Sequence, residues 1–562
     1  MMSSFATPRR ILLTIGGFAT GGAGFAVWLS GTFAGFPDPR SGYNAFYVVF
    51  AHNEVFGLSL LALFSFAAAL FCFREHAPEE EITSSSTKPT RKSMLVALIA
   101  AVVFAIAGLG TEWVCHNYAL SADEFMADFQ AQIFLRGEVT AKVPSHWLPA
   151  LRVLKPTYVD YLPQTQSWKA TYLPVYAALR AVFQSVYLQA FLNPFLAALT
   201  IFALYGTARN IWPNERRSAF AAVLLLAASA QFLVMAMTSY AMPAHLALNT
   251  IWLWLYSRPD RKRFYLAPVV GVLAIGLHQP IVHALFAAPF LFRFVWERKW
   301  RAASVFALLY SLGCAGWFAW RAHYAPPDAG ETQSFFRLLN PKMLVIQPMD
   351  LLLVLGWSCL ATPLLAVLGL RGILRERPIV RDAALSCLLT FSFYFFFLYN
   401  QGHGWGYRYF HGTLSCFIIV AVAGWNSLGK EMGWRAAGRF LGAGVAASLL
   451  LALPLRCFEA ESIIRPFARA SAAIHLMPVQ VVGVNLLGTW YAADLVRNDP
   501  YLENTPLVAT VIPGRLTERE VRTLQSAGKA RVLTKEQLGR YGLANVRGAG
   551  YSDDPFHLGE GP

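Results

Sequence analysis

The sequence predicts an all-α polytopic membrane protein with about 13 transmembrane helices, followed by a small C-terminal α/β domain outside the membrane. Composition is the first observation behind this prediction. Of the 562 residues, 56% are hydrophobic and only 14% are charged, whereas roughly a quarter of the residues in soluble proteins are charged. Two more observations are the many long apolar runs and the uneven distribution of basic residues between the loops that join them.

The apolar runs give the candidate membrane spans, because a spanning helix needs about 20 apolar residues. The candidates are 11–30, 54–73, 94–113, 183–206, 218–238, 243–257, 265–279, 281–295, 302–320, 347–370, 382–399, 411–428 and 439–456. The run 265–295 is divided at His278-Gln279-Pro280, where Pro280 cannot continue the first helix. We therefore predict a tight outer turn there.

Basic residues set the predicted orientation. Lys and Arg cluster in every second loop, beginning with Arg9-Arg10, and short loops rich in Lys and Arg stay on the cytoplasmic side. The N-terminus is therefore predicted inside and the C-terminal region outside. These clusters also account for much of the net charge of +15. The sequence has no basic-aromatic surface or motif typical of nucleic-acid binding.

Three domains are predicted. Residues 1–93 form an N-terminal helix pair with a polar cytoplasmic linker at 75–92, and residues 94–456 form the main transmembrane domain. An outer loop at 114–182 is too long to be a plain connector. Residues 457–562 form the small outer domain.

The long loop and the tail contain elements of their own. Apolar residues at a helical period predict that Asp123 to Gly137 is an amphipathic helix lying on the membrane, with Ser121 and Glu124 as a capping box at its start. In the tail we predict strands at Val479–Val484 and Leu507–Ile512 and helices at Thr517–Ala527 and Thr534–Tyr541.

Several classes of site are not predicted. The 7 cysteines are scattered, mostly in apolar runs, and have no CxxC spacing, so neither a disulfide framework nor a zinc site follows. The sequence also lacks a GxGxxG after a strand, a Walker sequence, a GxSxG elbow and an HExxH motif. A nucleotide-driven enzyme is therefore not expected.

Acidic residues give the main candidate site. Asp123, Glu124 and Asp128 follow closely after an apolar run, where lipid has no need of carboxylates. Asp123 and Glu124 are the candidate catalytic residues. The alternative is structural, because acidic residues favour the N-terminus of a helix through its dipole.

Basic and aromatic residues in the same loop suggest phosphate binding, since Lys and Arg donate charge-assisted hydrogen bonds. The residues are Lys142, His146, Arg152, Lys155 and Lys169, with Tyr158, Tyr161 and Tyr172 among them. Contact with lipid headgroups is the alternative for each of the basic residues.

Two further outer turns contain candidates. In Gln401 to Tyr409, three glycines allow close backbone approach, and Arg408 is the one cation, with Tyr407 beside it. A glycine-rich connection with an aromatic belt is the alternative. His278 and His283 are spaced poorly for a metal pair, so lining a cavity or bonding to a neighbouring helix is favoured for them and for His245.

A family resemblance connects these residues. The loop that opens with SADEFMADFQAQIFLRGEV resembles the first outer loop of the GT-C membrane glycosyltransferases, and more narrowly that of the protein O-mannosyltransferase and aminoarabinose transferase superfamily. NPFLAALTIFALYGTAR, SYAMPAHLALNTIWLWL, GLHQPIVHALFAAPFL and GWGYRYFHG are similar to later segments of bacterial members. The resemblance covers about residues 94–430.

The resemblance implies a glycosyltransferase in the bacterial inner membrane that moves a sugar from a polyprenyl-phosphate-linked donor to a lipid, glycan or protein acceptor at the outer face. Asp123 matches the catalytic base, with Glu124 beside it, and Arg408 matches a cation that faces the donor phosphate. The family's Lys-Pro-Pro element is partly matched by Lys155-Pro156, or by Lys169 with Tyr172-Leu173-Pro174.

Tyr172, Tyr407 and His278 complete the predicted substrate-binding residues. No cofactor is required by the sequence; a divalent cation, if used, would be held by Asp123 and Glu124. Two other functions stay open. A transporter or flippase of a lipid-linked saccharide predicts internal repeats and broken helices at the membrane midplane, whereas a non-catalytic envelope scaffold predicts that Asp123→Ala leaves function intact.

Overall fold

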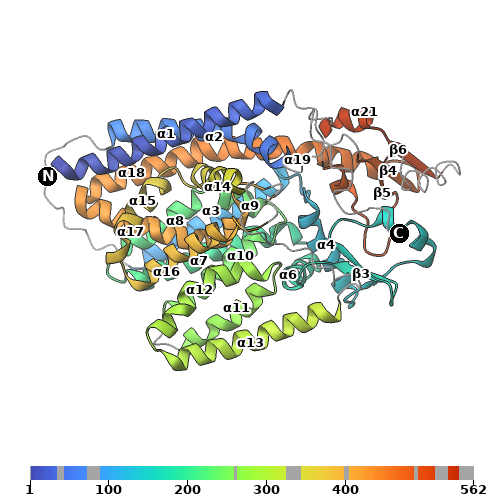
Figure 1. Cartoon of the computed structure of the whole chain (residues 1–562), viewed down its shortest axis with the longest axis horizontal. Helices are drawn as coiled ribbons and strands as arrows, with labels where there is room; N and C mark the ends of the chain where they lie inside the picture. Colours follow the sequence, from blue (N-terminus) through green and yellow to red (C-terminus); the bar gives the residue numbers. More distant parts are fainter. Residues whose placement is uncertain are drawn as a thin grey trace.

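The computed structural model describes residues 2–33, 44–72, 89–258, 262–324, 343–397, 401, 404–486, 491–512 and 529–543. Most of the helices form one bundle, and the strands gather at one end of it (Figure 1). The helices of the bundle are α1 (Met2–Phe33), α2 (Asn44–Phe71), α3 (Pro89–Trp113), α7 (Leu192–Ile211), α8 (Arg216–Ala227), α9 (Ala230–Met237), α10 (Met242–Tyr256), α11 (Ala267–Ile275), α12 (Pro280–Trp296), α13 (Trp300–His323), α14 (Met343–Trp357), α15 (Thr362–Arg371), α16 (Pro378–Phe393), α17 (Leu414–Met432), α18 (Trp434–Ala447) and α19 (Leu453–His475).

Among the described residues, 7 helices are long and apolar enough to cross a membrane, or up to 9 if each of two bent pairs is one span. The pairs are α8–α9, bent by 55°, and α14–α15, bent by 113°. The chain is therefore a multi-pass helical membrane protein. The count of thirteen stays a prediction, because several predicted spans are short helices: α10 has 15 residues, and the run divided before Pro280 gives α11 with 9 and α12 with 17.

Two glycines bring α15 and α17 into direct backbone contact. A Cβ added to Gly369 would lie 2.1 Å from the carbonyl oxygen of Val420, and one added to Gly424 would lie 1.9 Å from that of Leu365. Small residues at helix interfaces allow such close packing in membranes. The contact fixes α17, which follows the short helix η6 (Arg408–Thr413) and the turn that contains Arg408, against α15.

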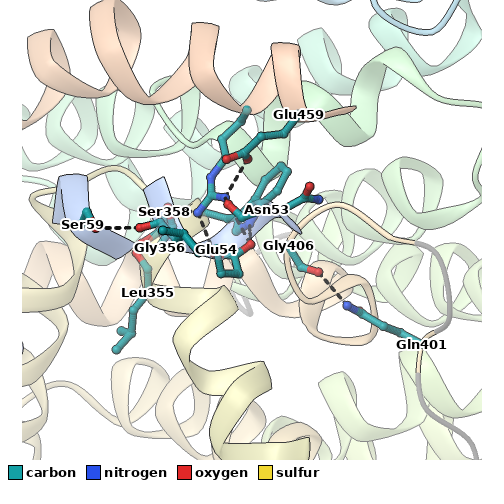
Figure 2. A network of polar contacts seen from close by, with 12 residues as sticks. Asn53, Glu54, Ser59, Leu355, Gly356, Ser358, Gln401, Gly406 and Glu459 are labelled. Carbon is teal, nitrogen blue, oxygen red and sulfur yellow. Dashed lines mark hydrogen bonds and ion pairs between the residues drawn. The ribbon is translucent and has the colours of Figure 1, made fainter. Parts of the chain in front are cut away.

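The N-terminal helices pack into the bundle through a buried ion network (Figure 2). Arg456 of α19 donates from Nη2 to Glu54 Oε2 of α2 at 2.8 Å and from Nη1 to Glu459 Oε2 at 2.8 Å. It also donates to the carbonyl oxygen of Gly356, at the end of α14, at 3.3 Å. Glu54 accepts a further hydrogen bond from Trp357 Nε1 at 2.7 Å. The network joins α2 to α14 and α19. Of the predicted linker at 75–92, residues 75–88 lie outside the described residues.

The loop 114–182, which the sequence predicts to face outside and which we call the outer loop, is a compact unit. Its elements are α4 (Ala122–Leu135), β1 (Ala141–Lys142), η1 (Ser145–Ala150), α5 (Leu151–Leu154), β2 (Val159–Leu162), β3 (Ser167–Ala170) and α6 (Val175–Gln184). The strands form an antiparallel sheet in the order β1-β3-β2, with Tyr161 opposite Trp168.

The predicted helix is present as α4, but the prediction that it lies on the membrane is wrong. Phe129 and Ile133 of α4 are fully buried, in one core with Trp168 of β3 and Leu507 of the C-terminal region. The sheet and the C-terminal region therefore cover the apolar face of α4, and this face does not rest on lipid headgroups.

The C-terminal region follows α19, which continues through the predicted domain boundary at 457 to His475. Parallel strands β4 (Val481–Asn485), β5 (Leu507–Val511) and β6 (Ala530–Leu533) pair in the order β5-β4-β6. β4 and β5 fall on the predicted strands, whereas the predicted helix Thr517–Ala527 lies outside the described residues. Helix α21 (Lys535–Leu538) begins with a capping box between Thr534 and Gln537.

Candidate active site

The site begins at the N-terminus of α4. The Ser121 side chain accepts a hydrogen bond from the backbone N–H of Glu124 at 3.4 Å, as predicted for an N-cap. The other half of the predicted capping box is wrong, because the Glu124 carboxylate turns away and accepts the backbone N–H of Ser239 at 3.0 Å. Asp123 lies in the first turn of α4, where the helix dipole favours its negative charge.

Four predicted site residues, Asp123, Arg408, Tyr172 and His278, lie together. Asp123 Oδ2 accepts a hydrogen bond from Arg408 Nη1 at 2.8 Å, and Asp123 Oδ1 accepts one from the Tyr172 hydroxyl. The Tyr172 ring lies against the ring of His278, with 3.8 Å between the centroids. Residues from α4, the end of the outer loop, the turn before α12 and the turn before α17 therefore meet at one point.

Local backbone geometry explains the position of Arg408. Gly406 has φ +69°, which favours glycine, and a Cβ there would lie 2.7 Å from Gln231 Oε1. Gln401 binds two residues of the turn. Its Nε2 donates to the Gly406 carbonyl at 2.9 Å (Figure 2), and its Oε1 accepts from the Arg408 N–H at 2.7 Å. Arg408 then begins the short helix η6 (Arg408–Thr413).

The pKa values of the two neighbouring carboxyl groups, Asp123 and Glu124, shift in opposite directions. Burial raises the pKa of Asp123, but the charge of Arg408 and the hydrogen bonds from Arg408 and Tyr172 outweigh burial and hold the pKa below its ordinary value. Burial raises the pKa of Glu124 to about 7, although the Ser239 N–H acts to lower it. Among the described residues, Oε1 of Glu124 has no hydrogen-bond partner. Asp123 is thus kept ionised, and Glu124 titrates near neutral pH.

Arg408 is enclosed by aromatic rings. Its guanidinium carbon lies 5.0 Å from the ring centroid of Tyr240 and 5.5 Å from that of Tyr409, distances at which a cation is attracted to the ring face. Its Nε has no hydrogen-bond partner within the part of the chain that the structure describes. Arg408 is therefore a buried cation that bonds to Asp123 and has one further N–H donor, Nε, available to a ligand.

The other predicted phosphate-binding residues do not bond directly to Asp123 or Arg408 among the described residues. Lys169 donates to Asp160 Oδ2 at 2.8 Å, across the β2–β3 pair. Burial lowers the pKa of Lys155, and Asp160 is the charge that opposes this effect. Both lysines therefore lie near Asp160. The Tyr407 hydroxyl accepts from Gln347 Nε2 at 3.4 Å, so this side chain points into the helix bundle.

Of the predicted histidines, His283 bonds to neighbouring helices, whereas neither ring nitrogen of His245 has a hydrogen-bond partner among the described residues. His283 pairs through Nδ1 with Asn249 and through Nε2 with Tyr310, both at 2.7 Å. The described residues contain no group of three or more His, Cys, Asp or Glu side chains that could hold a metal ion. Both oxygens of Asp123 bond to Arg408 and Tyr172, and Glu124 turns to Ser239. This arrangement does not fit a cation held between the two carboxylates.

Some residues at the site were not singled out in the sequence. Gln231 donates to the Tyr407 carbonyl at 2.7 Å and supports the Arg408 turn from α9. Asp494 and Arg497 of the C-terminal region contact the start of α4. No sequence signal marks these three residues, because their role depends on chain segments that are far apart. Tyr409, in contrast, is adjacent to Arg408 and has the same aromatic context.

Comparison with known proteins gives a clear result for the fold. No protein-family model matches the chain, and no curated protein matches its sequence. Two similar solved structures are crystal structures of ArnT from Cupriavidus metallidurans, one in the apo state and one bound to undecaprenyl phosphate. Both are 14% identical to this chain. The apo structure has a TM-score of 0.52, with 78% of this chain and 89% of that chain covered. The bound structure has a TM-score of 0.51, with 79% and 90% covered. The chain therefore has the fold of these ArnT structures, which agrees with the fold expected from the family resemblance.

Proposed function

We propose that this protein is a GT-C-type glycosyltransferase that transfers a sugar from a polyprenyl-phosphate-linked donor to an envelope acceptor at the outer membrane face. The meeting of Asp123, Tyr172, His278 and Arg408 is the observation that carries the proposal. The undecaprenyl phosphate bound to an ArnT of the same fold supports a polyprenyl lipid as the donor's carrier. The bacterial inner membrane is the proposed location.

The reaction needs a base and a cation. The acceptor hydroxyl oxygen bonds to the anomeric carbon, the bond from that carbon to the phosphate oxygen breaks, and its electron pair stays on the phosphate. Asp123 takes the hydroxyl proton, which as general-base catalysis contributes about 10²–10⁴ in rate. Arg408 stabilises the charge that develops on the departing phosphate.

The pairing of Asp123 with Arg408 makes the base dependent on the donor. While Arg408 bonds to Asp123, the carboxylate has a lowered pKa and is a weak base. A donor phosphate that draws the guanidinium toward itself weakens this pair, and the pKa of Asp123 then rises. The base is thus strengthened when the donor is bound, as proton abstraction requires.

Lys155 is the proposed lysine for the donor phosphate. The Lys169 ammonium donates to Asp160 Oδ2 at 2.8 Å and to the Ala170 carbonyl at 3.1 Å, whereas the Lys155 side chain forms no such ion pair among the described residues. Glu124 is the second candidate for the base, because its pKa of about 7 suits proton transfer at neutral pH. Its bond to Ser239 makes it the weaker candidate.

A transporter of a lipid-linked saccharide is the second candidate function. The bends within α8–α9 and α14–α15 favour it, since broken helices form the substrate sites of many transporters. The difference is chemical: a transporter moves the intact donor and leaves the bond from sugar to phosphate unbroken.

The test uses purified protein in lipid vesicles with a panel of polyprenyl-phosphate sugars and a membrane extract as acceptor. Release of free polyprenyl phosphate is measured for the wild type, for Asp123→Asn and for Asp128→Asn. Asp128 is in the same helix and pairs with Arg180, away from Asp123, so it is a matched control.

We expect release by the wild type and by Asp128→Asn, and about 10²-fold or more slower release by Asp123→Asn. Equal release by all three proteins moves the base away from Asp123. No release with any donor contradicts the proposed function, and movement of intact donor across the vesicle membrane then identifies a transporter.

A further inference from the structure

The start of α4 is capped by a residue from a distant part of the chain. Asp494 lies in the short helix η8 (Ala492–Leu495), and its Oδ1 accepts the backbone N–H of Ala122 at 3.2 Å. The first N–H groups of a helix have no partner within that helix. Ser121 satisfies the N–H of Glu124, and Asp494 satisfies that of Ala122. Two side chains therefore hold the turn that contains Asp123.

Arg497 holds the chain just before this turn. Its Nη2 donates to the carbonyl oxygen of Leu120 at 3.0 Å and to that of Ala119, and its Nε donates to the carbonyl oxygen of Asp494 at 2.8 Å. The guanidinium carbon also lies 3.9 Å from the ring centroid of Tyr118. One side chain thus ties the approach to α4 to the residue that caps α4.

The segment 491–512 that contains both residues is itself fixed to the outer loop. Asn498 Nδ2 donates to the Leu154 carbonyl at 2.7 Å, and Trp168 Nε1 donates to the Pro500 carbonyl at 2.6 Å. Leu507 shares a buried core with Phe129 of α4. The segment and the loop are therefore packed together as one unit.

Asp123 and Arg408 are held by different parts of the molecule. Arg408 is positioned by Gln401 and Gln231 at the membrane bundle, and Asp123 by the contacts at the start of α4. We infer that Asp494 and Arg497 are positioning residues that place Asp123 against Arg408. This inference rests on the proposed function, and it gives the C-terminal region an indirect part in the reaction, through the position of Asp123.

The experiment compares Asp494→Ala with Asp494→Asn, which keeps an oxygen acceptor for the Ala122 N–H. Glu503→Gln is the matched control, because Glu503 also joins the C-terminal region to α4 but does so at Arg136, on the exposed far end of the helix. Donor turnover, its pH profile and the unfolding temperature are measured for each protein. Amide hydrogen exchange of residues 118–125 is followed by mass spectrometry.

For Asp494→Ala we expect kcat to fall about 10- to 100-fold, because a displacement of about 1 Å costs up to 10²-fold, with KM little changed. The acid limb of the pH profile moves to higher pH, since Asp123 loses part of its contact with Arg408. Exchange at 118–125 becomes about tenfold faster, the effect of one lost hydrogen bond. Asp494→Asn restores most of both properties, and Glu503→Gln behaves as the wild type.

If Asp494 only stabilises the fold, Asp494→Ala lowers the unfolding temperature and leaves the acid limb of the pH profile in place. In that case Asp494→Asn does not restore kcat. That result, or unchanged kcat and exchange in Asp494→Ala, overturns the inference. Should Asp494→Ala fail to fold, Arg497→Lys takes its place, because it keeps the charge and removes the forked geometry. If even the wild type turns over no donor, the proposed function fails, and exchange at 118–125 alone decides whether Asp494 holds this turn.

Discussion

Ionisation is more costly for Glu124 than for Asp123, because the two carboxylates have different hydrogen-bond partners. Both oxygens of Asp123 are bonded, whereas one buried oxygen of Glu124 has no partner among the described residues. An unpaired charge in such a place is costly. Burial therefore raises the pKa of Glu124 from 4.5 to about 7. Its protonated form is the one that the folded protein favours.

This raised pKa predicts a pH-dependent stability. Because the folded pKa lies above the unfolded value of 4.5, the stabilising contribution of the carboxyl group is fully present below pH 4.5 and is lost as the pH rises through about 7. The loss is of the order of 3 kcal/mol at about 1.4 kcal/mol per pKa unit. Glu124→Gln, which stays neutral, removes this dependence.

The measurement is the unfolding temperature in detergent between pH 4.5 and 8. We expect it to fall more steeply with pH in the wild type than in Glu124→Gln. Asp128→Asn, which neutralises an ion-paired carboxylate in the same helix, is the control that should keep the wild-type slope. Parallel curves for the wild type and Glu124→Gln contradict the raised pKa.

Residue type and position in the sequence predicted part of the site. Asp123 and Arg408 were found because a carboxylate after a span and a single cation in a glycine-rich turn are unusual. Their contact spans 285 residues of sequence, and nothing in the local pattern indicates it. The same limit explains the wrong capping box: the Glu124 carboxylate bonds to Ser239, 115 residues away. Lys169 was not separated from Lys155 because Asp160 comes close only when β2 pairs with β3.

At the scale of helices, the buried ion network connects α2 to the rest of the bundle. Arg456, Glu54 and Glu459 have side chains that are at most 4% exposed, and each carboxylate bonds to the guanidinium. Arg456 also stacks on Trp357, with 4.4 Å from its guanidinium carbon to the ring centroid. Such a network contributes little net stability when intact, but removal of one partner leaves an uncompensated charge.

We therefore expect Arg456→Met to lower the free energy of unfolding by about 3–5 kcal/mol, because Glu54 and Glu459 would both lose their cation. Arg465→Met is the matched control on the same helix, since Arg465 is half-exposed and forms only a surface pair with Glu461. Surface pairs contribute about 0–1 kcal/mol. The unfolding temperatures of both variants in detergent give the comparison.

A second variant tests the cause of the loss. Combining Arg456→Met with Glu54→Gln and Glu459→Gln removes all three charges, and we expect much of the stability to return. If the combined variant is as unstable as Arg456→Met alone, packing around Arg456 matters more than charge. If Arg456→Met behaves as Arg465→Met, the network does not hold α2 in place.

Helices were predicted better than strands because their signals differ in length. Apolar runs mark the helices α3, α7 and α17 directly, but β1 has 2 residues and β2 and β3 have 4 each, too few to show a period. The strands at β4 and β5 were found because they are continuous apolar runs. The membrane placement of α4 was wrong because its periodicity shows that one face is apolar and does not show what covers that face.

At the scale of the whole molecule, the fold is shared with ArnT at 14% identity. In a membrane, many apolar sequences satisfy a spanning helix, because its backbone bonds are internal and lipid requires only an apolar surface. Polar residues are constrained far more strongly. A shared fold at 14% overall identity is consistent with this difference.

The orientation of the chain decides on which face the proposed reaction occurs, and it stays a prediction. The loop 114–182 and the strands β4–β6 lie at the same end of the bundle (Figure 1), so both must face the same side of the membrane. The positions of the basic loops predict that this side is outside.

We expect an impermeant thiol reagent to label His146→Cys, an exposed position of the outer loop, in intact cells. Arg377→Cys, an exposed position between α15 and α16, should be labelled only after the cells are permeabilised. The wild type, with its 7 cysteines, gives the background. The reverse pattern would place Asp123 and Arg408 in the cytoplasm, and the donor's sugar would then have to be presented on that side.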